Sequence, residues 1–315
     1  MQPVVYFDQN IWIELAKTYY GKYGKNSDQK IVQLCKNIIQ KSEKEEIIFP
    51  LSLVHMIETH HAANDERRNK LIDFMLKVSR GYIIYPINVV RQFEIEVASM
   101  KIMGLPTVDI TDLIVKKGGS GFFGAEGRIQ GSAPDFIKNE ILQFAESENF
   151  LRHLVKNPNL FKDKIDHFKH TEEINKIRES YLELVKDKKM RENYLLFINF
   201  KETVAVDIIK NCYSLGMRED NMWLRGWNES RFVHFCKSIP TFYVLFYLSY
   251  RSEMYINRQI DGHDFYDKVG LSVAIPYSDI VICEKMFASI AKQQKLDEDY
   301  DTIILSSLQE LSSYI

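Results

Sequence analysis

The chain has 315 residues, enough for one large domain or two ordinary ones with a sizeable hydrophobic core. Hydrophobic residues make up 45% of it and charged residues 27%, a globular composition that excludes a largely disordered chain. The formal net charge of −2 excludes a polycation, so a nucleic-acid partner would have to meet a local basic surface.

The spacing of the cysteines and the length of the apolar runs predict the cellular compartment. The cysteines lack C-x-x-C spacing, which argues against a zinc ribbon and favours reduced thiols; they are Cys35, Cys212, Cys236 and Cys283. The N-terminus leads directly into a predicted strand and not into a signal peptide. The longest aromatic and apolar run, 239–250, contains Pro240 and is too short to span a bilayer. We therefore expect a cytoplasmic protein without a membrane segment.

Short apolar strands alternate with helices over the first hundred residues. Strands are predicted at 4–8, 47–50 and 82–85, and helices at 10–20, 29–41, 52–61 and 65–79. Pro50 ends the second strand, and Ser52 suits the N-cap of the helix that follows. This alternation predicts an α/β fold with a parallel sheet.

The pattern changes after residue 103. Residues 104–131 are rich in glycine but lack the G-K-[ST] ending of a P-loop, which predicts a mobile connection or, alternatively, a lid. Residues 134–255 are predicted to be almost entirely helical, and strands return at 280–283 and 302–305. The predicted organisation is a discontinuous α/β domain, 1–103 and 255–315, interrupted by a large helical insertion, 104–254.

Acidic residues from remote parts of the chain fall at predicted strand ends or share a helix face. Asp8 ends the first strand, and Glu58 lies on the helix after the second. Asp264 and Asp267 are one helical turn apart. Clustered carboxylates repel one another and call for a hard cation such as Mg²⁺ or Mn²⁺. Such an ion could activate water and stabilise charge on a phosphate.

Two further acids bracket the predicted strand 280–283. Asp279 precedes it and Glu284 follows it. An extended strand of this length separates its ends by about 15 Å, so the two carboxylates are not expected to bind the same ion. Asp279 could instead cap the turn that enters the strand.

Four segments resemble the acid-bearing segments of PIN-like ribonucleases: Val5–Asn10, Phe49–Ser52 leading to Glu58, Asp264–Asp267, and Pro276–Glu284. The resemblance covers roughly 1–100 and 255–315 and leaves out the middle of the chain. It implies a Rossmann-like PIN fold and metal-dependent endonucleolytic cleavage of RNA, with 5′-phosphate and 3′-hydroxyl products. A toxin or phage-defence role would fit it.

The resemblance also implies roles for individual residues. The metal would be surrounded by Asp8, Glu58, Asp267 and either Asp279 or Glu284, with Asp264 close by as a further ligand. Glu284 stands where aspartate is more usual in the family. Asn10 and Lys285 would contact the RNA.

Two further groups of residues allow other interpretations, a zinc site on one helix and an RNA-binding surface in the insertion. His55 and Glu58 share a helix face, but their spacing matches no zinc-hydrolase motif, and surface histidines near a helix C-terminus are the plainer interpretation. Basic and aromatic residues of the insertion suit single-stranded RNA or, alternatively, a solvated helix with core tryptophans; they are Lys186, Lys188, Lys189, Arg191, Trp223, Arg225, Trp227 and Arg231. The alternative function is a non-catalytic RNA- or protein-binding scaffold. Besides RNA, the partner could be another protein or a second copy of the chain.

Overall fold

The computed structural model describes residues 2–21, 29–60, 64–119, 150–153, 188–217, 228–253 and 262–315. The fold is mixed α/β and mostly helical, with a small parallel sheet. It divides into two compact units, Met1–Pro86 with Leu113–Ile165 and Tyr277–Ile315, and Ile87–Asp112 with Asp166–Pro276. The predicted domain boundaries at 103/104 and 254/255 stay a prediction.

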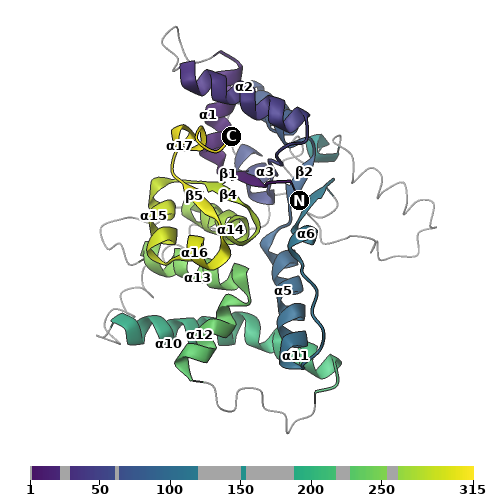
Figure 1. Cartoon of the computed structure of the whole chain (residues 1–315), viewed down its shortest axis with the longest axis vertical. Helices are drawn as coiled ribbons and strands as arrows, with labels where there is room; N and C mark the ends of the chain where they lie inside the picture. Colours follow the sequence, from purple (N-terminus) through teal and green to yellow (C-terminus); the bar gives the residue numbers. More distant parts are fainter. Residues whose placement is uncertain are drawn as a thin grey trace, which may run out of the picture. The chain divides into compact units, whose positions relative to one another are not determined.

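The first unit is built on a parallel sheet whose strands come from both ends of the chain. β1 (Val5–Phe7) pairs in parallel with β4 (Ile280–Ile282), which pairs in parallel with β5 (Ile303–Leu305) (Figure 1). Every residue of β1 and β4 is buried, which is the pattern of strands covered on both faces. The predicted parallel sheet is confirmed in these strands.

Isolated bridges extend this sheet beyond β1. Val4 bridges Ile48, and Leu51 bridges Ile83, both in parallel. Ile83 lies in β2 (Tyr82–Ile84), which pairs antiparallel with β3 (Val115–Lys117). Numbered along the chain, the five parallel segments therefore lie in the order 3-2-1-4-5, as in doubly wound folds. The order reverses between β1 and β4, which makes this pair the topological switch point.

Helices of the first unit are α1 (Gln9–Tyr19), α2 (Gln29–Glu43), α3 (Leu53–His60), α4 (Asp65–Ser79), α6 (Thr111–Ile114, which crosses the unit boundary), α15 (Lys285–Gln293), α16 (Leu296–Tyr300) and α17 (Leu308–Leu311). Trp12 of α1 is fully buried and packs its ring edge-on against Phe7 of β1 and Phe74 of α4. Such large buried aromatic contacts fix α1 on the sheet and bring the residue before it to a defined place.

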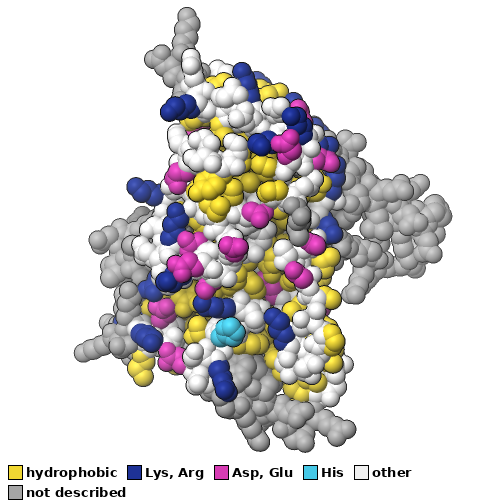
Figure 2. Space-filling view, viewed as in Figure 1, with side chains coloured by type: hydrophobic (Ala, Val, Ile, Leu, Met, Phe, Trp, Pro, Cys, Tyr) yellow, Lys and Arg dark blue, Asp and Glu magenta, His cyan; other side chains and the backbone are white. Residues whose placement is uncertain are grey.

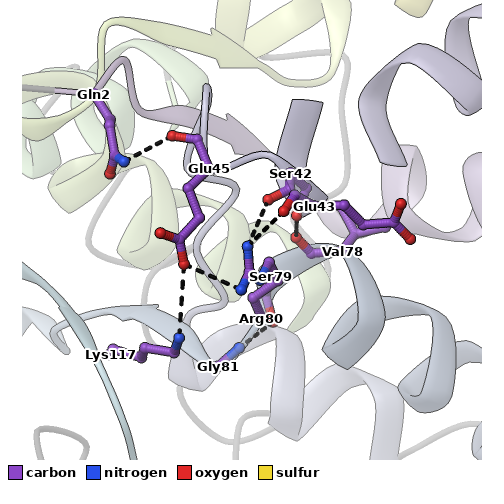
Figure 3. A network of polar contacts seen from close by, with 9 residues as sticks. All are labelled: Gln2, Ser42, Glu43, Glu45, Val78, Ser79, Arg80, Gly81 and Lys117. Atoms are coloured by element: carbon purple, nitrogen blue, oxygen red, sulfur yellow. Dashed lines mark hydrogen bonds and ion pairs between the residues drawn. The ribbon is translucent and has the colours of Figure 1, made fainter. Parts of the chain in front are cut away.

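A polar network joins the ends of α2 and α4 (Figure 3). Arg80 follows α4 in a left-handed conformation, with φ 52°. Its Nη1 donates to the carbonyls of Ser42 and Glu43, at 3.1 and 2.9 Å, which lie at the C-terminus of α2. Its Nη2 also pairs with Glu45 at 3.1 Å. One guanidinium thus satisfies carbonyls that the end of α2 leaves without helical partners.

The second unit consists of α5 (Ile87–Ile102), α10 (Lys188–Phe200), the π-helical turn η3 (Lys201–Ala205), α11 (Val206–Ser214), α12 (Glu229–Lys237), α13 (Pro240–Glu253) and α14 (Gly262–Tyr277, whose last residue belongs to the first unit). The buried Glu94 of α5 accepts hydrogen bonds from Thr241 N–H at 2.9 Å and Thr241 Oγ1 at 2.5 Å, at the start of α13. Helices dominate the described part of the predicted insertion. Residues 120–131 of the glycine-rich run lie outside the described residues, as do Lys186, Trp223, Arg225 and Trp227.

None of the four cysteines forms a disulfide, and all four are buried. Among the described residues, no helix combines the length and the apolar character that crossing a bilayer requires.

Candidate functional site

Asp8 lies at the carboxyl edge of the sheet, at the switch point. It follows β1 directly, and its N–H donates to the carbonyl of Ile282 in β4 at 2.9 Å. Asp8 is also the N-cap of α1, because its Oδ1 accepts a hydrogen bond from the N–H of Gln9 at 2.7 Å. The side chain is only 5% exposed. Strand and helix together therefore hold this carboxylate in a buried position where doubly wound folds bind ligands.

Glu58 is carried by α3, whose start is fixed by a reciprocal pair of hydrogen bonds. Ser52 Oγ accepts from the N–H of His55 at 3.3 Å, and the N–H of Ser52 donates to His55 Nδ1 at 3.0 Å. This is the geometry of a capping box, with histidine in the place of the usual glutamate or glutamine. Glu58 lies nearly two turns along the helix that this box begins.

His55 can accept that hydrogen bond only as a neutral imidazole. Its ring is fully buried and stacks on Tyr6 of β1, with the ring centroids 5.0 Å apart. Burial lowers the pKa of His55 to about 3, because the imidazolium would lose its water, and the Phe7 carbonyl only partly opposes this. The surface histidines predicted near the C-terminus of this helix are later residues, whereas His55 lies in its first turn with its ring packed inward against the sheet.

The carboxyls of Asp8 and Glu58 interact through charge and are named the Asp8–Glu58 carboxyl pair. The pKa of Glu58 is raised to about 8, first by its burial and second by the charge of Asp8. Glu58 therefore keeps a proton at neutral pH when no cation is present. Its Oε2 is buried and, among the described residues, has no hydrogen-bond partner. Such a strongly perturbed carboxyl beside a second one is typical of functional sites.

Three other predicted site residues lie at the same edge. Glu284 and Lys285 follow β4 after Cys283, and Asn10 is the second residue of α1; all three are exposed. Glu284 occupies the N-cap position of α15, yet its side chain makes no capping hydrogen bond. The carboxylate of Glu284 is thus placed to face solvent at the edge that carries Asp8.

Asp279 lies at the opposite edge, which corrects its assignment to the site. It precedes β4, and its Oδ2 accepts a hydrogen bond from the N–H of Val4 at 2.6 Å, just before β1. Its own N–H donates to the carbonyl of Val4 at 2.9 Å. Because the strands are parallel, Asp279 caps the amino edge while Asp8 and Glu284 follow the carboxyl edge. Of the two acids that bracket β4, only Glu284 lies on the side of Asp8.

Asp264 and Asp267 lie on α14 in the second unit, so the helix predicted for them is confirmed. Asp264 is 3% exposed and Asp267 is half-buried. The same helix carries a buried lysine that the sequence did not single out, Lys268, whose Nζ lies 3.4 Å from Glu253 Oε1 of α13. That these two aspartates join Asp8 and Glu58 stays a prediction.

The residues at the carboxyl edge fit a hard cation in part. Within the described ranges, no three side chains among histidine, cysteine, aspartate and glutamate are grouped to hold a metal ion. Two carboxylates are nevertheless a sufficient protein contribution for Mg²⁺, which commonly keeps waters and substrate phosphate oxygens as its other ligands. Zinc fits poorly, because His55 Nδ1 already accepts the hydrogen bond from Ser52.

Sequence reasoning missed two residues of this region, Gln9 and Thr59. Both are buried, and Gln9 Nε2 donates to Thr59 Oγ1 at 2.8 Å. Only the adjacency of Gln9 to Asp8 and of Thr59 to Glu58 could have drawn attention to them.

No protein-family model, curated protein or solved structure matches the chain.

Proposed function

We propose that this protein is a metal-dependent endoribonuclease of the PIN-like type. The observation that carries the proposal is the buried Asp8–Glu58 carboxyl pair at the switch point of a parallel sheet. Open α/β sheets bind their ligands outside the carboxyl ends of the strands at this point. The 3-2-1-4-5 strand order and the acid-bearing segments of the sequence support the same assignment.

Asp8 and Glu58 would hold the cation, and Mg²⁺ or Mn²⁺ bound there would supply an activated water and neutralise charge on the scissile phosphate. Binding of such a cation would displace a proton from Glu58, because a carboxyl must be ionised to act as a ligand. Cation affinity should therefore rise with pH up to the pKa of Glu58.

RNA as the substrate is taken from the resemblance of the acidic segments. In Figure 2, lysine and arginine side chains are interspersed with acidic ones over the face in view, in agreement with the net charge of −2. Contact with the phosphate backbone would therefore be local, through exposed groups at the carboxyl edge such as Lys285 and Asn10.

The test is cleavage of single-stranded RNA in Mg²⁺ or Mn²⁺ by the full chain and two variants with the same substitution. Asp8→Asn removes a ligand charge and should lower kcat by at least about 100-fold. Asp279→Asn is the matched control at the amino edge, where an amide oxygen can still accept from Val4. It should keep the wild-type rate.

Full activity in folded Asp8→Asn would refute the site. A wild-type protein that binds neither cation and cleaves no RNA would favour the non-catalytic scaffold.

A further inference from the structure

The two segments that carry the carboxyl pair are joined by one buried hydrogen bond. Gln9, the residue after Asp8, donates from Nε2 to Oγ1 of Thr59, the residue after Glu58, at 2.8 Å. Gln9 is 7% exposed and Thr59 is 1% exposed. Because water has little access to this bond, the bond is stronger and more directional than an exposed one would be.

Both partners of the bond are themselves held in place. The backbone N–H of Gln9 donates to Asp8 Oδ1 at 2.7 Å, so Gln9 contacts the carboxylate before it and the helix across from it. Thr59 Oγ1 donates in turn to Met75 Sδ of α4 at 3.7 Å, which leaves its lone pairs to accept from Gln9. The chain of contacts from Asp8 to α4 therefore passes through Gln9 and Thr59.

This arrangement leaves the other end of the amide with an unused acceptor. Gln9 Oε1 is buried and, within the part of the chain that the structure describes, accepts no hydrogen bond. Among the described residues, Glu58 Oε2 is likewise buried and has no hydrogen-bond partner. Buried acceptors without donors are costly, so each one calls for a structural or functional explanation.

We propose that Gln9 is a positioning residue, which ties α1 to α3 through Thr59 and thereby keeps the Asp8 and Glu58 carboxyls together. The proposal deepens the proposed function and rests on it where it concerns the cation. The hydrogen bond between Gln9 and Thr59, which we call the tether, is present in the metal-free protein.

The experiment removes the tether with the smallest change in shape. Thr59→Val in the full chain deletes the hydroxyl that accepts from Gln9 and keeps the side-chain volume. Thr302→Val is the matched control, because Thr302 is also buried but precedes β5 at the amino edge. Thr59→Ser restores a hydroxyl, and Gln9→Met, which keeps the length of the side chain without its amide, is a second way to break the bond.

Three quantities are measured for each variant: the pKa of Glu58 by carbon-13 NMR without metal, the Mn²⁺ affinity by calorimetry, and kcat and KM for RNA. In Thr59→Val and Gln9→Met we expect the pKa of Glu58 to fall toward the ordinary carboxyl range, since the pair separates and takes up water. We expect Mn²⁺ to bind about 10-fold more weakly, as when a group that orients a metal ligand is lost. We also expect kcat to fall more than KM rises. Thr59→Ser and Thr302→Val should behave as wild type.

An unchanged Glu58 pKa and unchanged Mn²⁺ affinity in Thr59→Val and Gln9→Met would overturn the tether, even in a protein that cleaves RNA. A wild-type protein without Mn²⁺ binding or cleavage would overturn the proposed function, while the Glu58 pKa would still decide whether Gln9 positions the pair.

Discussion

The negative charge of Asp8 helps to raise the pKa of Glu58, although the two residues lie on different elements. Asp8 follows strand β1, and Glu58 lies on helix α3. Burial and that charge together raise the pKa of Glu58 to about 8. A group of this kind links the stability of the fold, the pH and the binding of a cation.

Stability should fall with rising pH because of Glu58. The folded-state pKa is raised above the ordinary value of 4.5, so the folded protein binds more protons than the unfolded chain between those two values. The contribution is complete below pH 4.5 and is lost as the pH rises through about 8. Urea unfolding in EDTA should therefore give a free energy of unfolding that falls over this window by an amount on the order of a few kcal/mol. Glu58→Gln should remove the slope, and Mg²⁺ at pH 8 should restore stability in the wild type only.

His55 should produce the opposite slope at lower pH. Its folded-state pKa of about 3 lies below the ordinary value of 6.5, so the unfolded chain binds the extra proton. Stability from the neutral ring is complete above pH 6.5 and is lost as the pH falls toward 3. His55→Gln, whose amide oxygen can still accept from Ser52, should flatten the curve over this range. His55→Ala should in addition lower stability at pH 7 by about 2 to 4 kcal/mol, through the lost cap and the cavity. Equal pH slopes in wild type and His55→Gln would contradict the buried neutral histidine.

Arg80 offers a separate test of how the first unit is held together. Arg80→Ala loses the hydrogen bonds to the end of α2. It also places an alanine in a left-handed backbone conformation, which is unfavourable for a residue with a Cβ atom. Arg80→Gly loses the same bonds but relieves the backbone. Thermal unfolding should therefore rank wild type above Arg80→Gly, and Arg80→Gly above Arg80→Ala by about 0.5 to 1 kcal/mol. The reverse order of the two variants would show that the backbone conformation at this position is not strained.

The sequence was informative about the sheet because each strand is a short apolar run with a turn or an acid at its end. β1, β4 and β5 fall inside their predicted segments, and the acids after the first and fourth strands lie at one edge. For Asp279 the sequence left two alternatives open, a place beside the metal or a cap of the turn that enters the strand. Its hydrogen bond to Val4 then identifies it as a cap.

The contacts that build the site interior could not be predicted. The capping box of α3 uses His55, a residue outside the usual capping pattern, and its neutral state depends on burial under Tyr6. The hydrogen bond between Gln9 and Thr59 depends on how α1 packs against α3, which no local pattern encodes. Tertiary packing decides both, and a periodicity of apolar residues carries no information about which polar side chains it buries.

The pairing of β1 with β4 has a consequence for synthesis. Val4 and Asp279, which bond at the start of these strands, are 275 positions apart. At ribosomal rates of about 5 to 20 residues per second, the nascent first strand waits tens of seconds for its central neighbour. Until then, its unpaired edge is a site for wrong pairing with other chains. The carboxyl edge that bears Asp8 is likewise incomplete, so the activity proposed for it would begin only after the segment with β4 and Glu284 has been made.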